Sequence, residues 1–240
     1  MKSRWMVFVI GAMTAAWLWA AGVVAGQEQP VAFANPQAAG QAATEWLVAT
    51  HQNDDGGFTS FSTGADLAPS DVGGTVDAAL ALIAAGHSLD TVFTGQERSV
   101  LNYLQDHVSD AAAYANQDGA TAGKLVMALV AGGQNPRDFG RQDFVLTLTG
   151  HLSPTGQLGV NTAFNQSLAI LGLTAAAEPI PPSAVDWLVG LQADNGSWDD
   201  GFGTADNPDA TAMAIMALVS SGRAANDPVL QQATSFLAAA

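Results

Sequence analysis

The sequence contains no cysteine among its 240 residues. Disulfide bridges, thiolate metal sites, cysteine nucleophiles and lipid anchors on cysteine are therefore excluded. Basic residues are also scarce, because 7 lysines and arginines face 22 acidic residues and give a formal net charge of −15. A chain with this balance repels phosphate backbones and anionic membrane surfaces, so nucleic-acid binding has no support.

Charged residues of both signs make up only 12% of the chain, whereas 48% of its residues are hydrophobic. This composition is typical of a folded chain rather than a disordered one. The length suffices for one domain with a sizeable core or for a short array of repeats. No segment alternates apolar and polar residues with β-branched side chains, and the sequence therefore predicts no sheet.

The N-terminus has the pattern of an export signal. Lys2 and Arg4 precede an apolar run over residues 5–25, and small residues before Gly26 offer a cleavage site. The run is long, so a retained signal anchor is the alternative. Either interpretation predicts a secreted or cell-surface protein that meets a membrane only through this segment. The predicted divisions are a signal at residues 1–26, a linker at 27–35 and a repeat domain at 36–240.

The remainder of the chain contains an internal repeat. The motif Ala-Leu-aliphatic-small-small-Gly occurs at residues 81–86, 128–133 and 217–222, and a degenerate copy falls at residues 168–173. The steps between the clear copies are 47 and 89 residues, which gives a period of about 45. A period of this size suits one helical hairpin per repeat.

The segments before these motif ends are apolar nearly all round, and they predict buried inner helices. Alanine dominates them, which favours helix formation, and a final glycine is the expected C′ residue. The predicted inner helices span residues 75–85, 121–131, 162–177 and 209–221. Amphipathic segments predict outer helices over residues 36–50, 97–108, 141–149, 183–191 and 228–238.

Several helix starts are marked in the sequence. Asn35, Asn207 and Asp227 each stand before a proline, a combination that places an N-cap ahead of the first helical residue. Ser183 with Asp186 is similar to a capping box. The last outer helix has no inner partner after it, which predicts either a partial ring or a truncated chain.

Two outer helices run into matching turns with the pattern Gln-x-x-x-Gly-x-aromatic. The residues are Gln52, Gly56 and Phe58 in the first turn, and Gln192, Gly196 and Trp198 in the second. Asx-Gly supplies the positive φ that ends a helix, the glutamine bonds freed carbonyls, and the aromatic covers the helix end. A third copy over residues 151–159 keeps Gly156 without the aromatic, and no copy is recognisable near residues 107–114.

These turns, on hairpins of this period, resemble the QW repeat of the terpenoid cyclase and protein prenyltransferase superfamily. The resemblance covers roughly residues 36–240. It implies an all-α fold, an α/α toroid in a partial ring of about four to five helical hairpins. In this fold inner helices line a central funnel and outer helices surround them, as in squalene–hopene cyclases, prenyltransferase β subunits, complement thioester domains and cobalamin carriers.

The catalytic signatures of that superfamily are missing or degraded. Its zinc site and its thioester both need cysteine. Class II cyclases protonate with the middle aspartate of an Asp-x-Asp-Asp-Thr-Ala motif, and Asp209 takes that place within residues 207–212. Both flanking acids are missing, although a strong general acid needs neighbours that stabilise its conjugate base. The alternative for Asp209 is a carboxylate that favours a helix dipole.

Toroid relatives bind ligands near the N-terminal ends of their inner helices, which implies ligand-contacting residues at those ends here. The candidates are Asp77, Lys124, Asn165, Gln166 and Thr211. Asp77 and Lys124 take equivalent positions in adjacent inner helices, so they are expected to pair with each other or to face the cavity together.

Acidic loops at residues 53–55 and 194–206 are rich in oxygen ligands but lack the ordered spacing of a calcium loop. We therefore expect no metal site and no resident cofactor. Asp55 with Asp199 or Asp200 could serve as the carboxylate pair of a carbohydrate-active α/α barrel, but nothing in the sequence sets their separation.

The sequence thus predicts a non-catalytic module of this superfamily that works outside the cytoplasm. Its ligand is expected to be a small, largely apolar molecule, or a corrinoid by analogy with the cobalamin carriers, held in the central funnel. One alternative is a class II terpene cyclase with Asp209 as the proton donor. The other is a structural repeat of a larger surface protein with further domains downstream.

Overall fold

The computed structural model describes residues 36–60 and 68–239. These ranges contain ten helices and no strand, with only isolated bridges between single residues. The prediction of an all-α chain is confirmed for them. The predicted signal, the linker and the Asn35 cap lie outside the described residues. Within the described ranges no helix has the length and hydropathy needed to cross a membrane.

Contacts divide the chain into two units, Met1–Ala39 and Gly40–Ala240. Only the first turn of helix α2 (Pro36–His51) is described in the first unit.

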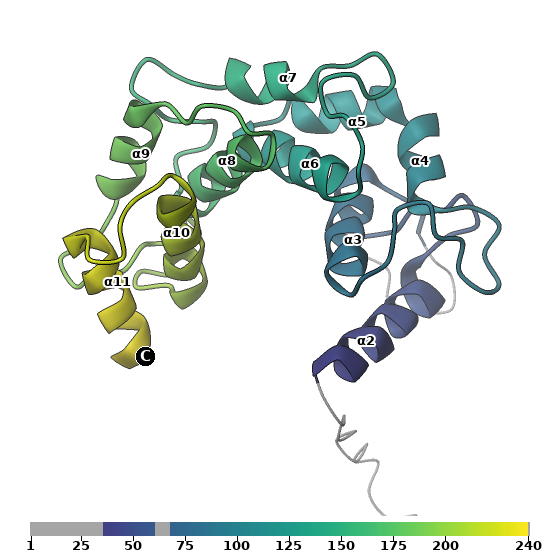
Figure 1. Ribbon diagram of the computed structural model, residues 1–240, viewed down its shortest axis with the longest axis horizontal. Helices are drawn as coiled ribbons and strands as arrows, with labels where there is room; N and C mark the ends of the chain where they lie inside the picture. The colour runs from purple at the N-terminus through teal and green to yellow at the C-terminus, as the bar shows by residue number, and fades with distance from the viewer. Residues whose placement is uncertain (1–35, 61–67, 240) are drawn as a thin grey trace, which may run out of the picture. The chain divides into compact units, whose positions relative to one another are not determined.

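Four helices of 13 residues form the inner set. They are α3 (Val72–Ala84), α6 (Gly119–Ala131), α8 (Ala163–Ala175) and α10 (Pro208–Ser220). They pack in chain order, α3 on α6, α6 on α8 and α8 on α10 (Figure 1). The predicted inner helices are confirmed, and each boundary lies within three residues of its expected place.

Each inner helix starts after a residue whose side chain accepts a hydrogen bond from the third helical N–H, at 2.7–3.0 Å. Such an N-cap satisfies one of the four N–H groups that a helix start leaves free. The caps are Asp71, Asp118, Thr162 and Asn207. They follow one another at steps of 47, 44 and 45 residues, which agrees with the predicted period.

The ends of the inner helices are equally regular. Gly86, Gly133 and Gly222 have φ values of 92°, 73° and 91°, in the left-handed region expected of a C′ glycine. In α8 the same place is held by Ala177 with a φ of 53°. The degenerate repeat motif therefore lies at residues 172–177, four positions after the match at 168–173.

Gly172 consequently stands inside α8, where it serves helix packing. A Cβ atom there would lie 2.4 Å from the Gly123 Cα of α6. A Cβ atom at Gly123 would in turn lie 2.5 Å from the Leu168 carbonyl oxygen. Only glycine permits two backbones to approach this closely, so this pair fixes the crossing of α6 and α8.

A helix is present in each of the five predicted outer segments. Four of them are α2, α7 (Phe144–Gly150), α9 (Pro182–Val189) and α11 (Pro228–Ala239). The segment predicted over residues 97–108 contains α4 (Val100–Asp106), and an additional helix α5 (Val108–Ala115), which was not predicted, follows it. The two are separated at His107, whose φ of −111° and ψ of 33° are not helical.

The predicted capping box of Ser183 with Asp186 is wrong. Helix α9 has Pro181 at its N-cap without a side-chain hydrogen bond, and Ser183 lies in the first turn. A proline at the first helical position has no N–H to satisfy and already has a helical φ, so this start needs less capping. The predicted Asp227 start is supported, because Asp227 Oδ1 accepts from the Val229 N–H at 2.9 Å.

Candidate functional site

The two Gln-x-x-x-Gly-x-aromatic turns have the same hydrogen bond. Gln52 Nε2 donates to the Gly56 carbonyl at 3.0 Å, and Gln192 Nε2 donates to the Gly196 carbonyl at 3.0 Å. The glycines have φ values of 85° and 89°. In each turn, therefore, the glutamine side chain holds a loop that only glycine forms without strain.

Each turn is also bonded to the inner helix that follows it. The Phe58 N–H donates to Thr75 Oγ1 at 2.9 Å, and the Trp198 N–H donates to Thr211 Oγ1 at 3.0 Å. Both aromatic side chains and both threonines are buried. Each threonine lies four positions after its N-cap, and the bond ties the start of the inner helix to the turn.

Gln166 occupies the same position in the third repeat. Its Oε1 accepts from the Leu158 N–H at 2.8 Å, and its Nε2 donates to the Gly156 and Ala184 carbonyls at 2.9 Å. In the second repeat the position holds Ala122, and α5 occupies the stretch before it. We term Thr75, Gln166 and Thr211 the clamp residues. They lie in the interior, bonded to turn backbone.

The other predicted site residues lie apart from one another, with one exception. Lys124 Nζ forms an ion pair with Asp77 Oδ1 across α6 and α3, with side chains 21% and 60% exposed. Asn165 is half-buried in the first turn of α8. Asp209 is exposed in the first turn of α10, where it forms no hydrogen bond or ion pair with the described residues. An aspartate in that place favours the helix dipole.

Carboxylates of the acidic loops are engaged by their own loops. Asp55 Oδ1 accepts from the Gly57 N–H and from the Ser70 hydroxyl, at 2.9 and 2.8 Å. The hydrogen bond from the Phe202 N–H is the main reason that the pKa of Asp200 is lowered. Across the described ranges, no three acidic or histidine side chains are grouped as metal ligands would be.

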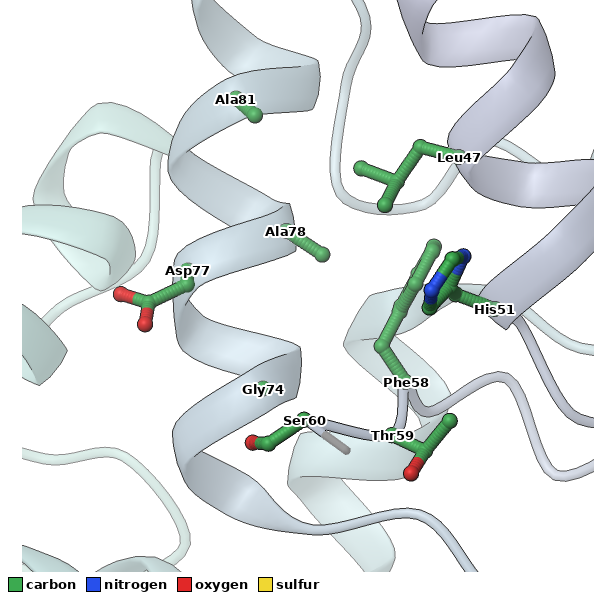
Figure 2. Close-up of a pocket in the computed structure, with 9 residues that line it drawn as sticks. All are labelled: Leu47, His51, Phe58, Thr59, Ser60, Gly74, Asp77, Ala78 and Ala81. Atoms are coloured by element: carbon green, nitrogen blue, oxygen red, sulfur yellow. The ribbon is translucent and has the colours of Figure 1, made fainter. Parts of the chain in front are cut away.

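A cavity of about 340 Å³ lies between α2 and α3 (Figure 2). Its wall on α3 is formed by Gly74, Ala78 and Ala81, which recur at helical spacing on one face. The small side chains of Ala78 and Ala81 leave room that the facing Leu47 and His51 of α2 do not fill. At Gly74 the space is taken by Ser60, whose backbone N would lie 2.8 Å from a Cβ atom there. We term this space the α2–α3 cavity.

The remaining lining residues give the α2–α3 cavity an aromatic floor and a polar end. Phe58, only 1% exposed, lines the cavity together with His51 (Figure 2). Thr59 and Ser60 follow it. His51 Nδ1 is 2.7 Å from the Thr50 hydroxyl, which leaves Nε2 free of hydrogen bonds to the described residues. Of the predicted ligand contacts only Asp77 lines this cavity, and Figure 2 shows it turned away from Leu47 and His51.

Apart from the alanines of α3, nothing in the sequence indicates this cavity. The position of α2 decides whether a neighbouring side chain fills the space that the small residues of α3 leave. No protein-family model and no curated protein sequence matches this chain. The superfamily resemblance of the turns therefore stays a prediction.

Proposed function

We propose that the chain is an exported, non-catalytic repeat module that binds a small, largely apolar ligand in the α2–α3 cavity. The observation that carries this proposal is the glycine and alanine wall of α3 beside Phe58, with about 340 Å³ of space before it. Ligand sites are concave and mostly apolar, with a few polar groups that orient the ligand. His51 Nε2 and the Thr59 hydroxyl are suited to that orienting role.

The arrangement of hairpins that we propose is the α/α toroid implied by the turn pattern. Three observations support it: the constant spacing of the N-caps, the equal length of the inner helices and their packing in chain order. Export is proposed from the N-terminal pattern, in which Lys2 and Arg4 precede an apolar run. The ligand is then one met outside the cytoplasm.

The size of the α2–α3 cavity favours a small ligand over a corrinoid. Its volume of about 340 Å³ is near the lower end of the range for sites that bury a drug-sized molecule. A corrinoid macrocycle would leave most of its surface outside such a cavity. The corrinoid is therefore the second candidate ligand.

The proposal is tested by titrating the purified protein with farnesol, oleate and cobinamide, with calorimetry as the readout. Ala81→Leu is the informative variant, because Ala81 is an exposed wall residue and the larger side chain occupies the cavity. We expect it to weaken binding of the apolar ligand at least about tenfold, through loss of the space that the ligand fills.

Ala84→Leu is the matched control, since Ala84 is exposed on the same helix and does not line the cavity. Its affinity should equal that of the unmodified protein. Failure of all three probes to bind, or equal affinities for the two leucine variants, would refute the α2–α3 cavity as the ligand site.

The two alternative functions have less support. A cyclase needs an activated acid, and the Asp209 side chain is exposed and has no hydrogen bond or ion pair with the described residues. A purely structural repeat requires no cavity. Incubation with squalene and geranylgeranyl diphosphate tests the cyclase alternative. A cyclic product formed by the unmodified protein but not by Asp209→Asn would support it.

A further inference from the structure

A second and larger cavity, of about 610 Å³, lies where the start of α3 faces α4 and α5. Two tyrosines line it, Tyr103 from α4 and Tyr114 from α5. The remaining wall is formed by Ser70, Asp71, Val72 and Gly73 at the start of α3 and by Asp110, Ala113 and Gln117. We term it the two-tyrosine cavity. It shares no lining residue with the α2–α3 cavity, so the inference below does not rest on the proposed function.

The Tyr103 ring is held between two neighbours. It stacks on the His107 ring with centroids 4.2 Å apart, and a Cβ atom at Gly57 would lie 2.6 Å from Tyr103 Cδ2. The residue is 3% exposed, and its hydroxyl forms no hydrogen bond with the described residues. The ring is buried, whereas the hydroxyl stays accessible at the cavity wall and is free to bond an occupant.

Tyr114, which is half-buried, presents a second hydroxyl to the cavity. Its ring lies over Gly73, where a Cβ atom would be 3.4 Å from Tyr114 Cε2. Its hydroxyl, like the Asp110 carboxylate and the Gln117 side chain, has no hydrogen bond or ion pair with the described residues. Phenol, carboxylate and amide oxygens all accept hydrogen bonds. The cavity therefore offers several unused acceptors.

The electrostatic environment of the cavity is negative. Asp71 accepts from the Gly74 N–H at 2.7 Å and from the Ser60 hydroxyl at 2.8 Å, bonds that favour its charged form. Burial, and then the charges of Asp55, Asp71 and Asp110, raise the pKa of Tyr103 to about 12. None of the described residues that line the cavity is basic. The negative potential of these carboxylates therefore reaches the Tyr103 hydroxyl.

The helix ends have opposite effects on this environment. The last turn of α5, which carries Tyr114, presents the negative end of its dipole. The start of α3 presents a positive end, and there the Asp71 carboxylate takes up one of the free N–H groups. Because the Asp71 carboxylate caps the positive end of α3, the combined potential of the helix ends and carboxylates favours a cation in the cavity.

We propose that the two-tyrosine cavity binds a small organic cation with several N–H donors, that is, an alkylguanidinium or a primary alkylammonium. Asp110 supplies the opposite charge, and the Tyr103 and Tyr114 oxygens with the Gln117 amide accept the N–H groups. The alkyl part lies against Val72 and the tyrosine rings. Within the described residues no carboxylates are grouped for a metal ion, so the ligand is an organic cation.

The test is calorimetric titration of the full chain with butylguanidinium. Butanol is the neutral comparator, and tetramethylammonium carries the charge without an N–H donor. We expect butylguanidinium to bind, butanol not to bind, and tetramethylammonium to bind at least about tenfold more weakly because its hydrogen bonds are missing. No binding of butylguanidinium, or equal affinities for the two cations, overturns the proposal.

Two variants locate the site. Asp110→Asn and Tyr114→Phe each remove one polar group and should weaken butylguanidinium at least about tenfold. Asp138→Asn is the matched control, since it removes the same charge from an exposed position outside the cavity. Equal losses for Asp110→Asn and Asp138→Asn would mean general attraction to an acidic protein and would overturn the proposal. Thermal unfolding establishes that each variant is folded.

The guanidinium group can belong to a free metabolite or to an arginine side chain of a polypeptide. Titration with agmatine and, separately, with a peptide that contains one blocked arginine distinguishes these sources. If neither of the two binds, the proposal is contradicted. Ala81→Leu, which fills the α2–α3 cavity, should leave butylguanidinium binding unchanged. The two binding proposals, one for each cavity, can therefore be refuted independently of each other.

Discussion

Thr75, Gln166 and Thr211 show how one position of the repeat does the same work with different side chains. Each accepts the N–H of a turn residue, over distances of 2.8–3.0 Å. All three are fully buried. A longer side chain reaches the turn in the third repeat, where the loop between turn and cap is shortest. The clamp is therefore conserved in geometry rather than in residue type.

Replacing Thr211 by valine should destabilise the fold by about 1–3 kcal/mol, because the buried Trp198 N–H loses its acceptor and valine keeps the shape. Urea unfolding measures the change. Thr234→Val is the control, since the Thr234 hydroxyl is exposed and bonds only within α11. Its effect should stay within about 0.5 kcal/mol. Similar losses for the two variants would contradict the clamp.

Asp71 should make stability depend on pH in the acid range. Burial raises its pKa, but hydrogen bonds from Gly74 and Ser60 outweigh that effect and lower it below the ordinary value of 3.8. A carboxyl with a lowered folded-state pKa stabilises the fold fully above its ordinary pKa, and that contribution is lost as the pH falls through the folded-state value.

The difference in unfolding free energy between the unmodified protein and Asp71→Asn should therefore be constant above about pH 5 and shrink below it. Asparagine keeps the capping oxygen and removes only the charge. Unfolding in urea at a series of pH values gives the difference. A difference that is the same at all pH values would show that the charge of Asp71 is irrelevant to stability.

At the residue scale the sequence predicted where polar residues gather, but it did not predict their roles. Gln166 and Thr211 were expected to contact a ligand because they lie near the starts of inner helices. They face the turn instead of the surface, and one-dimensional spacing does not reveal which neighbour a buried amide or hydroxyl meets. The two tyrosines gave no signal, since their cavity forms only when α4 and α5 are in place.

Helix ends provide the clearest test at the scale of single elements. Ala177 has the left-handed conformation that glycine has at the ends of the other three inner helices. Ala177→Gly should stabilise the protein by about 0.5–1 kcal/mol, because glycine avoids the steric cost of that conformation. Chemical denaturation measures the gain.

Gly133→Ala is the reciprocal variant. Its φ is 73°, and a Cβ atom there would have no neighbour within 4 Å, so only backbone strain changes. It should destabilise the protein by about 1 kcal/mol. A loss in Ala177→Gly together with no change in Gly133→Ala would contradict this account of the helix ends.

Periodicity and turn chemistry predicted nearly every helix of the second unit, because inner helices are apolar all round and end on glycine. Helix α5 was missed. Nothing local marks the break at His107, which is neither proline nor glycine, and the small alanines after it make only a short apolar face. Ala111 and Ala115 are fully buried. Tertiary packing therefore determines that this segment is a helix of its own.

Charge acts on the molecule as a whole. The net charge is −15, and four of the five basic residues in the described ranges already form ion pairs. Most carboxylates therefore repel one another without compensation. Screening of this repulsion should outweigh the weakening of a few exposed pairs.

The melting temperature should consequently rise between about 0.01 and 0.5 M sodium chloride. Differential scanning calorimetry measures it. Asp138→Lys, which reduces the net negative charge at an exposed position, should gain less from the same salt. A melting temperature that falls with salt would show that the ion pairs matter more than the self-repulsion.

The spacing between a turn and the helix cap that follows it varies widely along the chain. Thirteen positions separate Phe58 from Asp71, nine separate Trp198 from Asn207, and four separate Leu158 from Thr162. In the two longer cases the N–H of the cap donates to the carbonyl of the aromatic residue, at 2.9 and 3.0 Å. The length of the loop between turn and cap thus varies, while the spacing of the helix caps along the chain stays nearly constant. Segments of different length and chemistry can be exchanged at these points on an unchanged frame, which is how one scaffold acquires new recognition properties.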